Sequence, residues 1–323
     1  MFRYFVFRLI ALIPKLAIIT LIIFIGIQLI PGDAVSRSIP PDVYASLSTE
    51  QLEELRTALG LNDNLVMQYF RWMGNILKGD FGYSMVNGGS IAQIIGQRLP
   101  ATLELAGFGL LISLIFGLIL GIISALKKNT IADYANTTLG MIGLSVPEFF
   151  LGLCMIVVFS LNLKWFPTGG RIVIGKEAFF DRIEYLILPA LCIGVTYIAT
   201  LMRYTRASML DVLGKDYIRT ARSKGLSEMK VNVKHGFRNA LIPVMVVLVF
   251  RIPLLFGGTV VVENAFNYPG MGSMLVNAIS GSDLPLIMMT TLIIATVILV
   301  CSFLLDFVIA LLDPRIKLGF TQS

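Results

Sequence analysis

Six long apolar runs constrain this chain more than any other feature of its sequence. They lie near residues 9–30, 101–126, 135–161, 186–204, 241–262 and 284–312. A helix needs about 20 apolar residues to cross the hydrocarbon core of a bilayer, so each run is long enough to span a membrane. The composition agrees, since 56% of the residues are hydrophobic and 14% are charged. We therefore predict an all-α polytopic membrane protein with six transmembrane helices.

The charged residues predict how the chain is oriented in the membrane. Basic residues collect at Arg3, Arg8, Lys127, Lys128, across 203–238, and at Arg315 and Lys317. The alternate loops are balanced or acidic, with five basic against seven acidic residues in 31–98 and none against two in 263–283. Because basic loops stay in the cytoplasm, we expect both termini there. This placement at the ends of spans explains the net charge of +6 without nucleic-acid binding.

The first loop on the outer side, 31–100, is long enough to form a small helical insertion. Ser48 and Gln51 have the spacing of a capping box, and Gly60 would close the helix that they begin. A second segment, 65–77, is apolar and aromatic and is expected to pack on that helix or to lie at the lipid interface. The sequence thus predicts an extracytoplasmic insertion between the first and second transmembrane helices.

Several glycines fall at positions that favour close helix packing. Gly117 and Gly121 are four residues apart in the second run, and Gly140 and Gly143 lie in the third. Small residues at such spacing let two membrane helices approach closely. We therefore expect tight helix contacts along both runs.

Two charged residues fall near the middle of apolar runs: Glu148, next to Pro147, and Arg251, two residues before Pro253. Charges at that depth are costly and therefore informative. One interpretation is that each pairs within the helix bundle. The other is that they face a translocation path, where Arg251 would meet a substrate carboxylate and Glu148 a substrate amine. The prolines are expected to kink their spans.

The most basic stretch, 203–243, joins the fourth run to the fifth. It holds nine of the 26 Lys and Arg residues against three acidic ones, so it is expected to be cytoplasmic. A helix over Asp216 to Lys224 would end at Gly225, and a second helix would be capped by Ser227. The sequence predicts a short, exposed helical elbow, a shape that suits a groove on another protein.

No nucleotide-binding loop is recognisable in the sequence. The stretch 170–177 approaches G-x-x-x-x-G-K-[ST], but Glu177 stands where the Mg²⁺-binding hydroxyl belongs, and the stretch falls in an outer loop. No protease-like or metal-binding cluster is visible, and the one histidine, His235, is interpreted as a contact residue of the basic segment. The energy for transport would have to come from a partner or from an ion gradient.

Eight motifs, in order along the chain, together carry a resemblance to a known family. They are Arg8–Pro14 with Pro31–Asp33, QYFRWMGNILKGDFGYS at 68–84, RLPATLELA at 98–106, LSVPEFFLGL at 144–153, RTARSKGL at 219–226, HGFRNALIP at 235–243, NYPGMG at 267–272 and LLDPRIKLG at 311–319. The chain resembles the permease subunits of bacterial ATP-binding-cassette (ABC) importers for dipeptides, oligopeptides, nickel and related solutes. Within that group it is similar to the "B"-type permease, over nearly its whole length.

The resemblance implies an organisation of the chain and a site. It implies an N-terminal region at 1–97, a type I ABC importer transmembrane domain at 98–312 with a cytoplasmic coupling loop at 205–240, and a cytoplasmic tail at 313–323. Arg219-Thr220-Ala221 with Gly225 corresponds to the family's EAA loop, although Arg219 stands where a glutamate is usual and Leu241-Ile242-Pro243 follows later. The implied ATPase-coupling residues are Arg219, Thr220, Ala221, Lys224, Gly225, Leu226, Ser227 and Glu228.

The resemblance also implies partners. The working assembly would contain a second similar permease, one or two ATPase subunits and an external solute-binding protein, in the bacterial cytoplasmic (inner) membrane. This chain would bind no cofactor and catalyse no reaction, while ATP and Mg would be bound at the ATPase subunits. Glu148 and Arg251 match no functional motif of the family, and the solute is left open among peptides, nickel chelates, sugar oligomers and other solutes.

Two other classes of function fit the sequence less well. An ion-coupled secondary transporter of small solutes would also carry charges in its spans, but it typically shows two related halves with repeated broken helices, and no such repeat is visible here. An intramembrane enzyme would need a convergent acid/base or metal set. An importer permease therefore remains the leading expectation.

Overall fold

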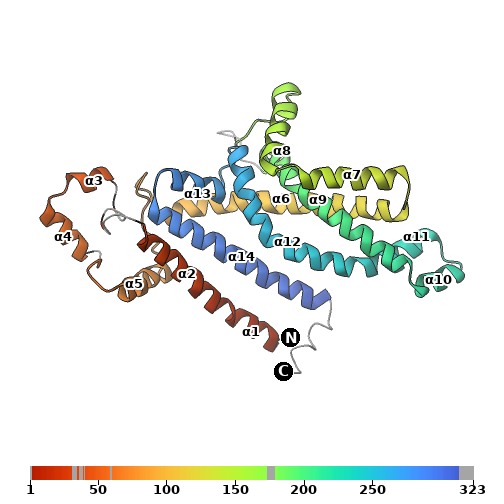
Figure 1. The fold of residues 1–323 in the computed structure, drawn as a ribbon, viewed down its shortest axis with the longest axis horizontal. Helices are drawn as coiled ribbons and strands as arrows, with labels where there is room; N and C mark the ends of the chain where they lie inside the picture. The colour runs from red at the N-terminus through yellow and green to blue at the C-terminus, as the bar shows by residue number, and fades with distance from the viewer. Residues whose placement is uncertain are drawn as a thin grey trace. The chain divides into compact units, whose positions relative to one another are not determined.

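The computed structural model describes residues 2–30, 35, 39, 41–58, 60–172 and 179–312. The expected tail at 313–323, the Pro31–Asp33 motif and most of the 170–177 stretch lie outside them. The described elements are α1 (Phe2–Ile10), α2 (Leu12–Gln28), α3 (Pro41–Ser46), α4 (Thr49–Ala58), α5 (Leu65–Leu77), α6 (Ile91–Leu126), α7 (Ile131–Ser145), α8 (Glu148–Met155), the π-helix η1 (Ile156–Asn162), α9 (Phe179–Leu213), α10 (Asp216–Ser223), α11 (Glu228–Lys230), the π-helix η2 (Val231–Phe237), α12 (Arg238–Ala265), α13 (Met271–Ser280) and α14 (Leu284–Leu312) (Figure 1).

The chain divides into two compact units. One comprises Met1–Phe5, Thr102–Pro269 and Val300–Ser323, and the other comprises Val6–Ala101 and Gly270–Leu299. The second unit thus joins the N-terminal part of the chain to a late segment that contains α13.

Four helices of the described chain are long and apolar enough to cross a membrane. They are Val6–Gln28, Ile91–Leu126, Asp181–Leu213 and Leu284–Leu304. Two bent pairs meet the same criterion only when their halves are taken together: Ile131–Ser145 with Glu148–Asn162, and Glu228–Leu248 with Phe250–Ala265. The described residues therefore offer four spans, or six where each bent pair crosses as one.

The third apolar run is not the single helix that the sequence predicted over 135–161. Val146 and Pro147 between α7 and α8 are extended, with ψ of 125° and 136°. A proline disfavours helical backbone at the residue before it, which explains the extended Val146. The expected kink is therefore a break, across which the two halves are bent by 106°.

The fifth run keeps its helix but bends. Pro253 lies inside α12. A proline removes the hydrogen bond to the carbonyl four residues earlier, here at position 249. The 46° bend falls between Leu248 and Phe250, on either side of that position.

In the second unit, α4 and α5 bear out the helices expected in the first loop. The Ser48 amide donates to Gln51 Oε1 at 2.9 Å, and the Gln51 amide donates to Ser48 Oγ at 3.3 Å, so the capping box is confirmed. Tyr69 of α5 forms a 2.8 Å hydrogen bond with the Thr20 hydroxyl of α2, and its ring lies 5.5 Å from that of Phe24. The aromatic segment therefore packs on α2.

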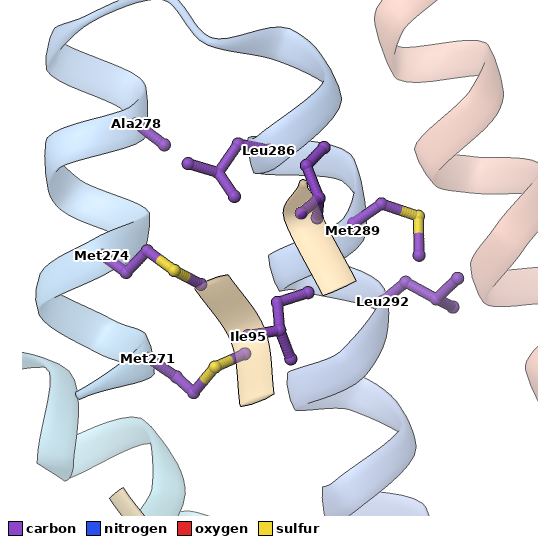
Figure 2. Packing of buried hydrophobic residues seen from close by; sticks show 8 residues of the cluster. Ile95, Met271, Met274, Ala278, Leu286, Met289 and Leu292 are labelled. Atoms are coloured by element: carbon purple, nitrogen blue, oxygen red, sulfur yellow. The ribbon is translucent and has the colours of Figure 1, made fainter. Parts of the chain in front are cut away.

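The core of the second unit is formed where α6, α13 and α14 meet. Figure 2 shows Ile95 of α6 between Met271 and Met274 of α13 and Leu286 and Met289 of α14, all buried. Methionine is flexible enough to fill irregular gaps between helices. Near this core the buried Asp283 carboxylate accepts hydrogen bonds from the Ser84 hydroxyl and from the Met85 amide at 3.1 Å.

In the first unit, α6 and α9 pack closely where the glycines predicted it. A Cβ added at Gly121 would lie 2.5 Å from Thr205 Cβ and 2.7 Å from the Met202 carbonyl oxygen. A Cβ added at Gly117 would lie 2.6 Å from Leu201 Cβ. Since real atoms do not approach so closely, only glycine fits this contact.

The glycines of α7 serve the same purpose on another side of α9. A Cβ added at Gly140 would lie 2.5 Å from Met202 Cε, and one at Gly143 would lie 2.9 Å from Val195 Cγ1. The close contacts expected in the second and third runs are thus both made to α9, which positions the elbow that follows it.

Candidate functional site

The segment between α9 and α12 is a helical elbow, which we define as residues 214–230 (Figure 1). The helix α10 ends at Ser223, and Gly225 takes a φ of +75°, the left-handed conformation that favours glycine. Ser227 stands at the N-cap of α11, although its side chain accepts no capping hydrogen bond. The predicted bend at Gly225 is confirmed.

One face of the elbow is fastened to the helix bundle. Ile218 and Ala221 of α10 are 0% and 6% exposed, and they join a buried cluster with Met209 and Val212 of α9. The same cluster includes Ala125 of α6, Val231 of η2 and Ala240 of α12. Residues three apart on a helix share a face, which is why Ile218 and Ala221 are buried together. The elbow is therefore built onto the ends of the helices beside it.

The opposite face of the elbow is open. Arg219 has a side chain that is 78% exposed, and its contact with Asp216 is long, at 3.7 Å. Thr220 and Lys224 are also exposed. Met229 is 79% exposed, so the open face also presents a large apolar side chain among charged ones.

An ion pair bridges the bend. Arg222 Nε lies 2.8 Å from Glu228 Oε1, and Arg222 Nη2 lies 3.2 Å from Oε2, so the guanidinium holds both carboxylate oxygens. Exposed pairs of this kind contribute about 0.2–1 kcal/mol to stability, so this pair adds little to the stability of the fold. At the start of the elbow, a hydrogen bond from Lys215 to Asp211 raises the pKa of the lysine.

The eight residues expected to couple to an ATPase therefore differ in what their side chains do. Arg219, Thr220, Lys224 and Ser227 are exposed. Ala221 is buried and Leu226 packs at the edge of the same cluster. Gly225 makes the bend, and Glu228 braces it. Sequence reasoning missed Met229 on the open face, although an apolar side chain among charged neighbours is a signal that was present.

The structure places Glu148 and Arg251 in the first unit, on α8 and α12. Glu148 is the first residue after the break at Pro147, and a Cβ added at Gly258 of α12 would lie 3.1 Å from its Oε2. Within the residues that the structure describes, neither Glu148 nor Arg251 is part of an ion pair.

A second polar cluster, which the sequence did not reveal, ties the segment before α9 to α6. Arg171 lies with Nη2 2.6 Å and Nε 3.0 Å from Glu104 Oε2, and both side chains are largely buried. Tyr268 donates to the same oxygen at 3.5 Å. Burial, and then the nearby Glu104 carboxylate, raise the pKa of Tyr268, so its hydroxyl keeps the proton that it donates.

Comparison with known proteins adds independent findings. The model of a family described as "Binding-protein-dependent transport system inner membrane component" matches residues 117–318. A second model, for the N-terminal part of such membrane components, matches residues 1–106. Together the two matches cover nearly the whole chain.

Curated relatives of similar length are also found. The oligopeptide transport system permease protein AppB of Bacillus subtilis (strain 168) is 41% identical, with 98% of this chain and 100% of the relative covered. The glutathione transport system permease protein GsiC of Escherichia coli (strain K12) is 37% identical, with 98% and 99% covered.

The fold itself matches a solved structure. A chain of the MetNI methionine ABC transporter, captured in inward-facing conformations, superposes with a TM-score of 0.55 at 14% sequence identity. The match covers 68% of the present chain and 97% of the other. At that identity it supports the shared fold alone.

Proposed function

The chain belongs to the family of binding-protein-dependent transport system inner membrane components, as a permease of the peptide group of ABC importers. From that premise we propose that it forms a translocation path with a second, similar permease and that ATP hydrolysis by partner subunits moves it through the elbow. The ATP and Mg would be bound by one or two ATPase subunits. An external binding protein would deliver the solute.

The observation that carries this proposal is the division of the elbow into two faces. Ile218 and Ala221 fasten one face to α9, α6 and α12, so a force applied to the elbow is passed directly to the helices. Arg219, Thr220, Lys224 and Met229 leave the other face open to a partner. A short helix held in this way moves as a rigid body with the spans to which it is joined.

In the proposed cycle, closure of the ATPase pair would draw together the elbows of the two permeases. The cavity between the permeases would change from inward-open to outward-open, and the binding protein would release solute into it. Hydrolysis would then reset the assembly. Alternating access of this kind needs no catalytic residue in the permease.

We propose the following arrangement in the bacterial inner membrane. Each bent pair crosses once, which gives six spans and places both termini in the cytoplasm. The helices α3, α4 and α5 then form an extracytoplasmic insertion. We also propose the division of the chain into 1–97, 98–312 and 313–323 that the family resemblance implies.

For the path, we propose Glu148 and Arg251 as residues that meet the solute. The relatives are named as permeases for oligopeptides and glutathione, which carry both an ammonium and carboxylates. An unpaired charge within a span is stabilised when a polar solute or water faces it.

Glu148→Gln and Arg251→Gln are expected to lower transport rates or change solute preference, whereas Glu50→Gln in α4 is the matched control. Unchanged rates and preference in both variants would remove these residues from the path.

Transport in proteoliposomes tests the proposal as a whole. The chain is reconstituted with its second permease, the ATPases and the binding protein, and uptake of labelled peptides is measured. We expect uptake to require ATP on the side of the membrane where the ATPase subunits lie. It should persist when an ionophore collapses ion gradients. Uptake that does not depend on ATP and is abolished by the ionophore would instead identify an ion-coupled secondary transporter.

A further inference from the structure

A partly buried ion pair lies in the first unit, outside the eight residues expected to couple to the ATPase. Arg206 of α9 holds Asp133 of α7, with Nε 2.7 Å from Oδ1 and Nη2 2.7 Å from Oδ2. The Asp133 side chain is 2% exposed and that of Arg206 is 28% exposed. The two residues are 73 positions apart in the sequence, so the pair joins elements that the chain itself does not connect.

Asp133 also holds the turn between α6 and α7. The Asn129 amide donates to Asp133 Oδ2 at 3.0 Å, and Asn129 has a φ of +62°. A side-chain hydrogen bond of Asn136 to Ser124 Oγ, at 3.1 Å, links α7 to α6 a little further along. The carboxylate of Asp133 thus receives three N–H groups and fixes the end of the α6–α7 hairpin to α9.

Arg206 sits where the elbow begins. Met209 and Val212, within two turns after it on α9, pack against Ile218 of the elbow. Thr205, immediately before it, lies against Gly121 of α6. The last turns of α9 therefore contact both the elbow, through Met209 and Val212, and the α6–α7 hairpin, through Arg206.

Stability alone does not account for an ion pair in this place. Removing two charges from water offsets much of their attraction, and apolar side chains of similar size would hold the helices equally well. A guanidinium that grips both oxygens of a carboxylate adds a defined direction, so it resists rotation of one helix about the other. That property matters where a helix must turn its neighbour.

We propose that Asp133 and Arg206 are positioning residues for energy coupling, which make the α6–α7 hairpin move with the elbow as one rigid body. The inference rests on the proposed function, because it assumes that the elbow is where ATP-driven movement enters the chain. Without the pair, the elbow would still dock, and part of its movement would be lost between α9 and the hairpin.

The first test measures coupling in the reconstituted complex. Asp133→Asn removes the negative charge. Arg206→Lys keeps the positive charge but cannot form the bidentate hydrogen bonds to the carboxylate. We expect both variants to assemble and to hydrolyse ATP, while peptide uptake per ATP hydrolysed falls about tenfold. The control is Asp211→Asn, which breaks the exposed pair with Lys215 and should leave the ratio unchanged.

The second test measures rigidity directly and does not depend on the solute. Spin labels are placed at Lys128→Cys, in the α6–α7 turn, and at Ser223→Cys, in the elbow, after the native cysteines are replaced. Both positions are exposed. We expect one narrow distance distribution with and without ATP in the parent complex, and a broad one in Asp133→Asn or Arg206→Lys.

The outcomes separate the inference from the proposed function. An unchanged transport-to-ATP ratio in both variants, or the same narrow distances in the variants as in the parent, would overturn the role of the pair and leave the proposed function standing. A parent complex that does not depend on ATP would overturn the proposed function itself.

Discussion

Gly225 is the residue at which the elbow depends most on backbone conformation. Its φ of +75° lies in the region where an L side chain is disfavoured by about 1–2 kcal/mol. Apart from the two neighbouring residues, no atom in the described part of the chain lies within 4 Å of the position that a Cβ would take, so the penalty is conformational. We predict that Gly225→Val abolishes co-purification of the ATPase or coupled uptake while the spans stay folded.

Gly79 provides a matched control for that prediction. It has a φ of +82° and equally open surroundings, but it lies in the loop after α5. Gly79→Val should therefore carry a similar strain and still co-purify with the ATPase and support uptake. Normal co-purification together with normal uptake in Gly225→Val would contradict the role of the bend.

Arg219 allows a gentler test of the exposed face. Its side chain is 78% exposed, and substitutions at such positions usually change stability by less than about 0.5 kcal/mol. Arg219→Glu should therefore leave assembly intact and reduce the uptake stimulated by ATP, because the charge presented to the ATPase is reversed. Arg219→Gln separates loss of charge from reversal. An Arg219→Glu complex with undiminished uptake would show that this side chain does not contact the partner.

At the scale of the elements, the contact between α6 and α9 is tightly packed at Gly121. We predict that Gly121→Ala lowers the thermal unfolding midpoint in detergent, because a Cβ there would meet Thr205 and the backbone of α9, and overpacking typically destabilises by about 1–3 kcal/mol. Gly107→Ala, on the same helix but with nothing within 4 Å, should be neutral or slightly stabilising. Equal midpoints for the two variants would refute the close contact.

Local signals in the sequence predicted the elements well. Ser48 and Gln51 cap α4, Gly225 bends the elbow, and the glycines of α6 and α7 lie against α9, because each of these effects depends on residues a few positions apart or on a helix face. The break at Pro147 was expected only as a kink. A proline fixes the backbone of its neighbours but not the direction that the next helix takes, so the 106° angle could not be predicted.

The ion pairs could not be predicted from the sequence for a related reason. Arg206–Asp133 and Arg171–Glu104 join residues 73 and 67 positions apart. Such pairs depend on which helices become neighbours, and many charged residues are equally plausible partners in the sequence alone. The elbow that we propose for coupling could be located by its motif, whereas the division of its residues into buried and exposed sets required the packing around Ile218.

For the whole molecule, the bent pairs decide the topology. If each crosses once, the chain has six spans and both ends are cytoplasmic, whereas a re-entrant α7–α8 pair would leave five and place the ends on opposite sides. We predict that green fluorescent protein fused to either terminus fluoresces in cells, since it matures in the cytoplasm and not after export in unfolded form. Fluorescence at one end alone would contradict six spans.

The burial of Ile218 and Ala221 has a consequence for how such importers diversify. The side chains that pack the elbow against the helix bundle are distinct from those on its exposed face. Substitutions in one set can therefore accumulate without changes in the other. On the proposed function, changing the exposed set would alter which ATPase the elbow fits and would leave the packing of the helix bundle unchanged. Grafting the exposed elbow residues of another permease onto this chain therefore offers a route to hybrid importers.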